Sequence, residues 1–339
     1  AELGCIVLFS ARRLRMNFEP LLRLERLSVG FNTETGPVRV IEDVSFDVPL
    51  AATVGLVGES GCGKSVTAQT IMRLLPSPPS RIDGGCVIFE GVDLLSLSET
   101  QMQKIRGDRI GMIFQEPMTS LNPTMRVEDQ IVEVLSLHRG HSAASARSLA
   151  ADILRKVGIG NPQARLRQYP HELSGGLRQR VMIAIALVCG PRLLIADEPT
   201  TALDVTIQAQ ILDLLKSLQK TMNLSILLIT HDLGVVAEMC SEIIVMYAGA
   251  VVERGSAPKV LAKPLHPYTA GLLAASPRRA RKGQRLITIP GTVPAPGIQR
   301  IGCQFAQRCS RALPVCRTSM PGIKELAPEH HAACWNPVP

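Results

Sequence analysis

The sequence predicts an α/β protein with a parallel sheet, followed by a small irregular C-terminal domain that is rich in cysteine. Short apolar segments that suit buried strands alternate with helical segments, and this alternation implies a parallel sheet with right-handed crossovers. After Pro277 prolines become frequent and the hydrophobic periodicity is lost. Four of the nine cysteines fall in this last part of the chain.

Strands are expected where short apolar runs lie between polar or turn-forming residues. These segments are 21–29, 40–48, 53–57, 87–89, 110–114, 193–196 and 225–230. Helices are expected at 66–75, 128–137, 144–157, 177–189 and 208–222. Pro76 should end the first helix, and the proline and glycine residues of 76–85 predict a loop.

The domain organisation follows from these segments and from the charge. We expect an N-terminal extension at 1–18, with Met16 as a natural start, a main domain at 19–276 and a C-terminal domain at 277–339. Residues 278–339 contain ten Lys and Arg against two Asp and Glu, whereas the rest has 27 of each. Such a basic tail is typical of contact with nucleic acid or anionic lipid, and equally of an ordinary solvated basic surface. Aromatic residues make up only 3% of the chain. Because single-strand binders need aromatic stacking platforms, we expect no nucleic-acid partner.

A glycine-rich motif, GESGCGKS at 58–65, lies between an expected strand and an expected helix. It fits the P-loop pattern, in which backbone N–H groups and a helix N-terminus surround phosphate oxygens. Lys64 should reach the β- and γ-phosphates, and the Ser65 hydroxyl should ligate Mg²⁺. The residues expected to contact the nucleotide here are Ser60, Gly61, Cys62, Gly63, Lys64, Ser65 and Val66.

A second motif, LLIADEPT at 193–200, is an apolar strand that ends in two carboxylates. Ligands of open α/β sheets bind at this edge. Asp197 is expected to hold the Mg²⁺ hydration shell and Glu198 to polarise the attacking water. Phosphoryl transfer mainly needs positioning and charge neutralisation, which these groups supply.

A third motif, LSGGLRQR at 173–180, opens a helix with Ser174, Gly175 and Gly176. It is a second anion-binding helix N-terminus, although an ordinary N-cap with a flexible turn would have the same residues. One mononucleotide needs only one phosphate loop. The second one therefore predicts contact with the nucleotide of another molecule.

The order of these motifs resembles that of ATP-binding cassette (ABC) transporter ATPases, a P-loop NTPase fold with a helical subdomain, here about 116–178. The resemblance implies that Gln115 is the Q-loop glutamine that touches Mg²⁺, that Asp204 is the D-loop aspartate and that His231 contacts the γ-phosphate. An aromatic residue near the first strand stacks on adenine in this family, and Phe31 is the candidate, although it could simply pack in the core. Glu198, His231 and Gln115 would be the catalytic residues.

The segments HPYTAGLL at 266–273 and GCQFAQRC at 302–309 resemble the ATPase subunits of dipeptide and oligopeptide permeases, and the P-loop region resembles their D-type subunit. The resemblance implies a peptide importer at the cytoplasmic face of the inner membrane. Its partners would be a second, F-type ATPase, two permease subunits and an extracytoplasmic binding protein. Relatives also carry nickel, glutathione and other solutes, so the solute stays open. Rival classes are a cassette acting on DNA or ribosomes, which would use the basic tail, and a structural metal-binding module.

Cys303, Cys309, Cys316 and Cys334 are predicted to bind one metal centre. A zinc site normally contains a close C-x₂₋₄-C pair, which is absent here, although His330 or His331 could replace one thiolate. A [4Fe–4S] cluster takes four thiolates from different directions, which suits wide spacing. We expect the iron–sulfur cluster, with Zn²⁺ and free thiols as alternatives, and a structural role for it.

Overall fold

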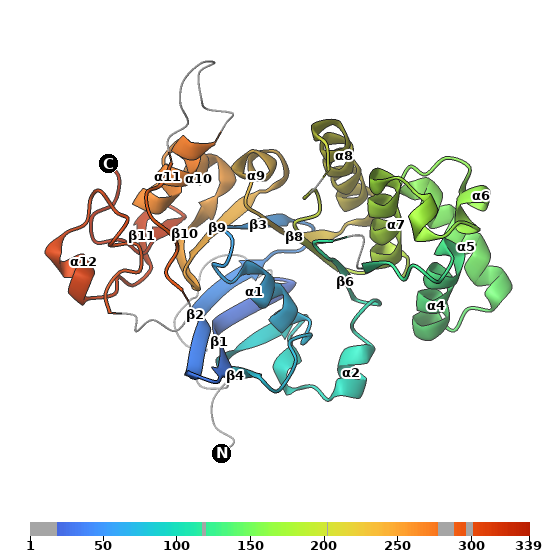
Figure 1. Ribbon diagram of the computed structural model, residues 1–339, viewed down its shortest axis with the longest axis horizontal. Helices are drawn as coiled ribbons and strands as arrows, with labels where there is room; N and C mark the ends of the chain where they lie inside the picture. The colour runs from blue at the N-terminus through green and yellow to red at the C-terminus, as the bar shows by residue number, and fades with distance from the viewer. Residues whose placement is uncertain (1–18, 117–119, 202, 277–287, 296–300) are drawn as a thin grey trace.

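The computed structural model describes residues 19–116, 120–201, 203–276, 288–295 and 301–339. The expected N-terminal extension at 1–18 lies outside the described residues. Within them, eight strands form one mixed sheet in the order β11-β12-β10-β9-β3-β8-β7-β6, and four strands form a second sheet in the order β2-β1-β4-β5. Figure 1 shows the larger sheet crossing the molecule, the smaller one beside it and a group of helices at one end.

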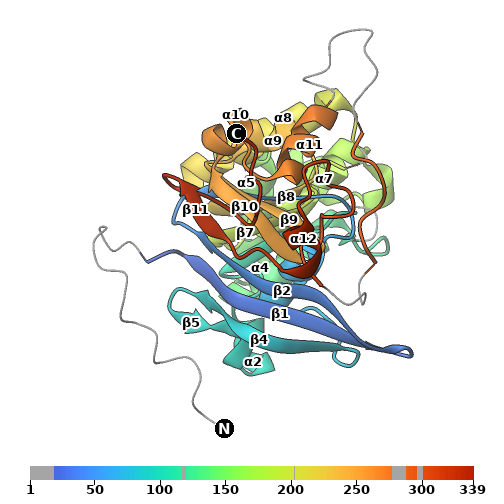
Figure 2. The ribbon, with the colours of Figure 1, turned by 90° about the vertical axis from the view of Figure 1, so that its left-hand side faces the viewer.

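The smaller sheet is antiparallel, and Figure 2 shows it lying below the larger one. Its strands are β1 (Leu22–Thr33), β2 (Gly36–Val48), β4 (Ser80–Phe89) and β5 (Val92–Asp93). The sequence predicted shorter strands, and it was wrong about the loop at 76–85. Ser80 to Gly84 pair with the outer half of β1. Cross-strand pairing therefore gives a strand to a segment whose composition favours a turn.

The centre of the larger sheet is parallel, as the alternation of strands and helices predicted. Its strands are β9 (Glu242–Tyr247), β3 (Thr53–Val57), β8 (Ser225–Thr230), β7 (Leu193–Asp197) and β6 (Ile110–Ile113). The residues of β3, β6, β7 and β8 are buried throughout. Strands covered on both faces read as continuous apolar runs, which explains why their sequences predicted them well.

Helices cover both faces of these parallel strands, and the side chains of β7 divide between them. Leu193 and Ile195 pack with α1 (Lys64–Ile71) in the core between the two sheets, whereas Leu194 and Ala196 pack with α7 (Gly175–Leu187) on the other face. The first helix was predicted to run to residue 75 but ends at Ile71. The helix therefore ends before it reaches Pro76, which was predicted to end it.

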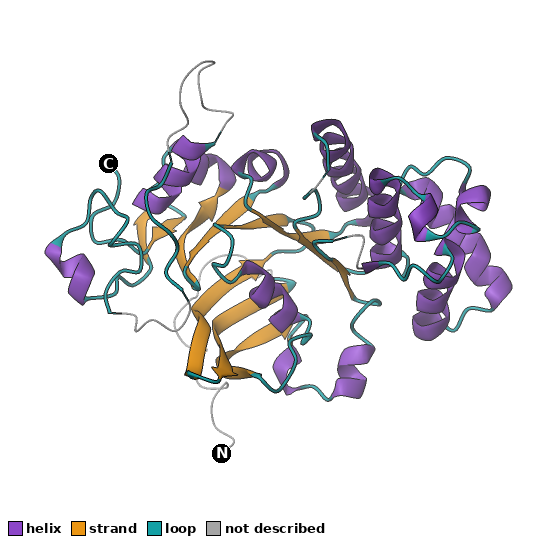
Figure 3. Cartoon of the chain, viewed as in Figure 1, coloured by secondary structure: helices purple, strands orange, loops and turns teal. Residues whose placement is uncertain are grey.

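A group of helices gathers at one end of the molecule, at the right in Figure 3, and the others lie elsewhere around the sheets. In the range predicted as a helical subdomain, the chain forms α4 (Val127–Arg139), α5 (Ala143–Lys156), α6 (Pro162–Leu166) and a 3₁₀ turn (Pro170–Glu172). α8 (Val205–Met222) begins three residues before the predicted start. The shorter elements are a 3₁₀ turn (Leu94–Ser96), α2 (Glu99–Gln103), α9 (Leu233–Met239), α10 (Ala257–Ala262), α11 (Pro267–Ala275) and α12 (Pro314–Thr318).

The sequence predicted a small irregular C-terminal domain, and the described residues of this region add two strands to the larger sheet. These strands, β11 (Lys324–Ala327) and β12 (His330–Ala332), continue the larger sheet beyond β10 (Ala250–Ser256). β12 lies between β10 and β11 in this sheet, and Figure 2 shows the labelled strands β10 and β11 in the same part of the molecule. Phe305 packs against the rings of Tyr247 and Tyr268, at centroid distances of 5.2 and 5.4 Å. The C-terminal segment therefore shares the core of the main domain.

Candidate functional site

The P-loop motif forms the turn between β3 and α1. A Cβ atom at Gly58 would lie 2.3 Å from the carbonyl oxygen of Met246, so only glycine fits at the end of β3. Gly63, which precedes α1, has a φ of 103°, in the left-handed region that glycine adopts without strain. Ser60 and Gly61 are exposed at the tip of the loop, and Val66 is partly buried. The loop therefore has the shape that the motif predicted.

Lys64 lies inside this loop and is only 5% exposed. Its Nζ donates hydrogen bonds to the carbonyl oxygens of Gly58, at 2.8 Å, and Glu59, at 3.0 Å. The same nitrogen lies 3.8 Å from the Sγ of Cys62. Burial raises the pKa of the Cys62 thiol, and Lys64 partly opposes this. The ammonium group thus closes the loop on itself and keeps a positive charge at its centre.

Asp197 ends β7 beside this loop and is 4% exposed. Burial raises the pKa of its carboxyl group, while a hydrogen bond with the Ser65 side chain acts in the opposite direction. Its Oδ1 is buried and has no hydrogen-bond partner among the described residues. A buried carboxylate oxygen next to a hydroxyl is the kind of hard ligand that Mg²⁺ takes. These two side chains fit the magnesium role that the sequence predicted for them.

Glu198 follows Asp197 and accepts hydrogen bonds from three side chains. Its Oε2 accepts from Gln115 Nε2 at 3.2 Å and from Thr201 Oγ1 at 2.8 Å, and its Oε1 accepts from His231 Nδ1 at 3.1 Å. Burial works against the ionised form, but the hydrogen bonds from His231 and Thr201 outweigh it and lower the pKa of Glu198. The structure thus brings together the three residues predicted to be catalytic, from three separate strand ends.

Other predicted site residues lie elsewhere on the chain. Ser174 and Gly175 are exposed at the start of α7, which packs on the opposite face of the sheet from α1. Gly176 is partly buried, and a Cβ atom at this position would lie 3.0 Å from Ile207 Cγ2. Asp204 is an exposed N-cap of α8 and accepts from the backbone N–H of Ile207 at 2.9 Å. These residues are therefore not part of the P-loop site of their own chain.

Phe31 lies on β1, where it pairs with Val38 of β2 and Ser80 of β4. Its ring is partly buried against the core between the two sheets. This is the packing contact that the sequence left open as the alternative to an adenine-binding role. That role stays a prediction.

Sequence reasoning missed several side chains that hold the site. The Thr201 hydroxyl donates to Glu198 Oε2 at 2.8 Å, and no pattern considered in the sequence singled it out. Gln179 is buried within α7 and donates to the carbonyl oxygen of Pro199 at 2.6 Å. An amide among the apolar residues of a buried helix was the available signal for it. Glu59 and Arg308 form an ion pair across 249 positions of sequence, which no local pattern could have revealed.

The four C-terminal cysteines lie in one region and are not joined by disulfides. The backbone N–H of Cys303 donates to the carbonyl oxygen of Cys316 at 2.7 Å. Burial, and to a smaller extent the nearby thiols of Cys316, Cys334 and Cys309, raise the pKa of the Cys303 thiol to about 11. Nevertheless, no three His, Cys, Asp or Glu side chains of the described residues are arranged to hold a metal ion. The predicted metal centre is thus not supported by this geometry.

Each described helix is too short or too polar to cross a membrane. Two family models match the chain. One is described as "ABC transporter" and matches residues 41–201. The other is described as "Oligopeptide/dipeptide transporter, C-terminal region" and matches residues 252–316.

Similar proteins agree with both matches. The chain is 52% identical to a probable peptide ABC transporter ATP-binding protein of Sinorhizobium fredii, over 95% of this chain and 98% of that protein. It is 50% identical to the oligopeptide transport ATP-binding protein OppD of Bacillus subtilis, over 93% of this chain and 88% of that protein. A dimeric post-hydrolysis structure of the ATP-binding cassette MJ0796 bound to ADP and Pi is 27% identical, with a TM-score of 0.62, and covers 70% of this chain and 98% of that one. Together with the P-loop and the carboxylates beside it, these matches show that the chain belongs to the ABC transporter ATPases that carry the C-terminal region of oligopeptide and dipeptide transporters.

Proposed function

We propose that the chain is the ATP-hydrolysing subunit of an importer that takes up dipeptides or oligopeptides through partner permease subunits. The observation that carries this proposal is the group of hydrogen bonds that Gln115, Thr201 and His231 make to Glu198, next to a P-loop lysine and a buried aspartate. Peptide as the solute rests on the C-terminal region and on the names of the similar proteins.

The site residues divide the work of ATP hydrolysis between two groups. Residues 60–66 surround the phosphates, and Lys64 places a positive charge against the β- and γ-phosphates. Ser65, Asp197 and Gln115 would hold Mg²⁺, which supplies charge neutralisation during phosphoryl transfer. Phe31 is proposed to stack on the adenine ring.

The second group acts on water. Glu198 is kept ionised by its hydrogen bonds, so its carboxylate can accept a proton from the attacking water. His231 orients Glu198 through its Nδ1 atom. Its imidazole ring is largely exposed, so its Nε2 atom would contact the γ-phosphate. Gln115 donates to the Glu198 carboxylate at 3.2 Å, and it would also touch Mg²⁺, so its position would depend on whether nucleotide is bound.

The complete ATP site is proposed to need two cassettes. Ser174, Gly175, Gly176 and Asp204 lie away from the P-loop of their own chain, and most of them are exposed. In a head-to-tail pair they would close over the nucleotide of the partner. The dimeric solved cassette bound to ADP and Pi supports this arrangement.

The partners are proposed to be an F-type second ATPase, two integral permease subunits and an extracytoplasmic binding protein. The chain would lie peripherally at the cytoplasmic face of the inner membrane. We propose 19–276 as the cassette, with its helical subdomain at about 116–178, and 277–339 as the region specific to peptide permeases.

Uptake of a radiolabelled tripeptide tests the transport proposal. Cells that lack the chain should lose uptake, wild-type chain should restore it, and the Glu198→Gln variant should not. Restoration by Glu198→Gln would contradict a role for ATP hydrolysis at this site. Unchanged uptake in cells without the chain, together with lost uptake of another solute, would exclude peptide as the solute.

We also propose that Cys303, Cys309, Cys316 and Cys334 hold a structural [4Fe–4S] cluster, with Zn²⁺ as the alternative. Support comes from the grouping of four free thiols: burial, together with the nearby Cys316, raises the pKa of the Cys303, Cys309 and Cys334 thiols, and a bound cation would stabilise their thiolate forms. A single zinc ion with Zn–S bonds of about 2.3 Å needs sulfurs about 3.8 Å apart. A cluster of several iron atoms accepts thiolates that are farther apart.

Anaerobic purification separates these alternatives. The cluster predicts a brown protein with about four irons per chain, and Cys316→Ser should remove both colour and iron. A colourless protein with one zinc would favour the alternative. A colourless protein without metal would reject both.

A further inference from the structure

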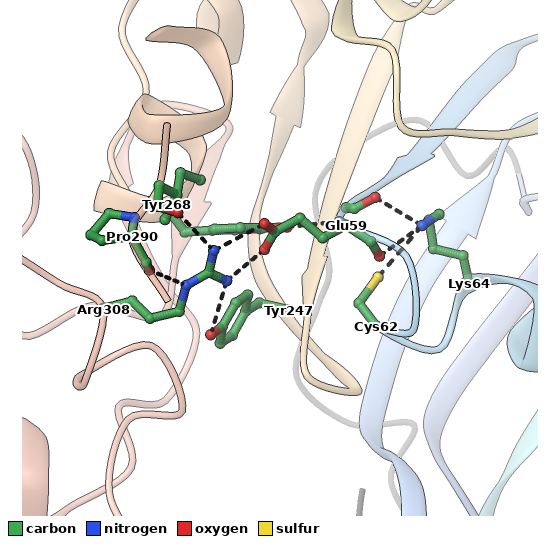
Figure 4. Close-up of polar contacts among 9 residues, drawn as sticks. Glu59, Cys62, Lys64, Tyr247, Tyr268, Pro290 and Arg308 are labelled. Carbon is green, nitrogen blue, oxygen red and sulfur yellow. Dashed lines mark hydrogen bonds and ion pairs between the residues drawn. The ribbon is translucent and has the colours of Figure 1, made fainter. Parts of the chain in front are cut away.

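Arg308 connects the C-terminal segment to the P-loop. Its two terminal nitrogens donate to both carboxylate oxygens of Glu59, at 2.7 and 3.0 Å. Such a two-point contact between guanidinium and carboxylate fixes orientation as well as distance. The Arg308 side chain is only 5% exposed, whereas the Glu59 side chain is 30% exposed, so water reaches the contact mainly from the Glu59 side. Figure 4 shows the pair between the C-terminal segment and the P-loop.

Other contacts fix the guanidinium itself. Its Nε donates to the carbonyl oxygen of Pro290 at 2.8 Å, and a terminal nitrogen donates to the Tyr247 hydroxyl at 3.4 Å. The guanidinium carbon also lies 5.8 and 5.9 Å from the ring centroids of Tyr247 and Phe305. Arg308 is therefore held in one place by the C-terminal segment and the sheet.

Every polar group of Glu59 has a partner. Its carboxylate accepts from Arg308, its backbone N–H donates to the Tyr268 hydroxyl at 2.8 Å, and its carbonyl oxygen accepts from Lys64 at 3.0 Å. Figure 4 shows these contacts in a line from Arg308 to Lys64. The position of the P-loop lysine therefore depends on Glu59, and the position of Glu59 depends on Arg308.

Arg308 is placed by a tight turn of the cysteine-containing segment. Its backbone N–H donates to the carbonyl oxygen of Phe305 at 3.0 Å, and the backbone N–H of Ala306 donates to the carbonyl oxygen of Cys303 at 3.0 Å. Cys309 is the next residue along the chain. The order of this turn thus determines where the guanidinium lies.

We propose that Arg308 is a positioning residue of the ATP site, which makes nucleotide binding depend on the order of the cysteine-containing segment. This inference rests on the proposed role of residues 58–65 as the phosphate loop. Arg308 touches neither phosphate nor water. It acts through Glu59 by keeping the loop in the shape that binds phosphate. Without Arg308, only a fraction of the molecules would hold the loop in the shape that binds phosphate. The apparent affinity for ATP would fall in proportion to that fraction.

The test measures ATP affinity and turnover of the full-length chain. Arg308→Ala should raise the KM for ATP and the Kd of a fluorescent ATP analogue about tenfold, with kcat within about twofold. Arg308→Lys keeps the charge but loses the two-point contact. Its KM for ATP should therefore lie between those of the wild type and Arg308→Ala. Glu59→Gln should behave like Arg308→Ala, and the double variant should be no worse than either single one, because both remove the same contact.

Arg311→Ala is the matched control. Arg311 lies in the same segment but donates to Asn336 and to the carbonyl oxygen of Pro337, away from the P-loop. It should leave the KM for ATP unchanged. Wild-type affinity in Arg308→Ala, or additive effects of Arg308→Ala and Glu59→Gln, would overturn the proposal. Unchanged ATP binding in Lys64→Ala would instead reject the phosphate-loop role itself.

Discussion

Glu253 gives the sharpest prediction about stability. Its carboxylate is completely buried in β10 and accepts three hydrogen bonds. These come from the backbone N–H groups of Leu265, at 2.7 Å, and His266, at 2.8 Å, and from His330 Nε2, at 2.7 Å. One side chain therefore joins β10, the start of α11 and the C-terminal strand β12.

Glu253→Ala leaves all three donors buried without an acceptor. Each such group costs about 1–3 kcal/mol, so the free energy of unfolding should fall by about 3–5 kcal/mol after water enters the space. Glu253→Gln keeps the Oε1 acceptor but turns an amide donor toward the His266 N–H. Its loss should be smaller, about 2 kcal/mol.

Urea unfolding followed through Trp335 measures this effect, because the single tryptophan of the chain lies in the C-terminal segment and donates to Ser319. Glu238→Ala serves as the control, since it removes an exposed ion pair with Lys216, which is worth about 0–1 kcal/mol. If Glu253→Ala lowers the free energy of unfolding measured through Trp335 no more than Glu238→Ala does, the reasoning is refuted. It would mean that the three donors find other partners.

Two further predictions concern charge. Lys64→Ala should weaken binding of a fluorescent ATP analogue at least tenfold, because the loop loses its cation. The melting temperature should change little, because the glycines of the loop remain. An affinity equal to that of the wild type would exclude Lys64 from phosphate binding. Burial lowers the pKa of His266 to about 3. The unfolded chain therefore takes up a proton below about pH 6.5 that the native chain refuses, and stability should fall by about 1.4 kcal/mol per pH unit as the pH drops toward 4. His266→Asn keeps an acceptor for the Tyr268 N–H and should show a shallower slope in urea unfolding between pH 6 and 4; an unchanged slope would assign the loss to other groups.

The parts of the site that could be predicted from the sequence lie at strand ends. Lys64 comes soon after the buried strand β3, Asp197 ends the buried strand β7, and parallel strands bring their carboxyl ends to one edge. The motifs predicted these two residues without any knowledge of packing, whereas the role of His231 came from the resemblance. Strand β9 could also have been found, since its sequence is almost entirely apolar.

Other features could not be predicted because they depend on contacts between distant segments. β4 begins in a segment of proline and glycine composition, and only pairing with β1 makes it a strand. Glu253 looks like an ordinary strand carboxylate until β12 brings His330 against it. Arg308 meets Glu59 only because the C-terminal segment folds back onto the sheet. Tertiary contacts, which local propensity does not contain, decide all three.

ATP hydrolysis by Glu198→Gln tests the central claim most directly. Glutamine preserves the size of the side chain but cannot accept a proton from water. Hydrolysis should therefore fall by about 10²–10⁴-fold, while binding of a fluorescent ATP analogue stays within about twofold. Near-normal steady-state hydrolysis in this variant would contradict the assignment of Glu198 as the carboxylate that polarises the attacking water.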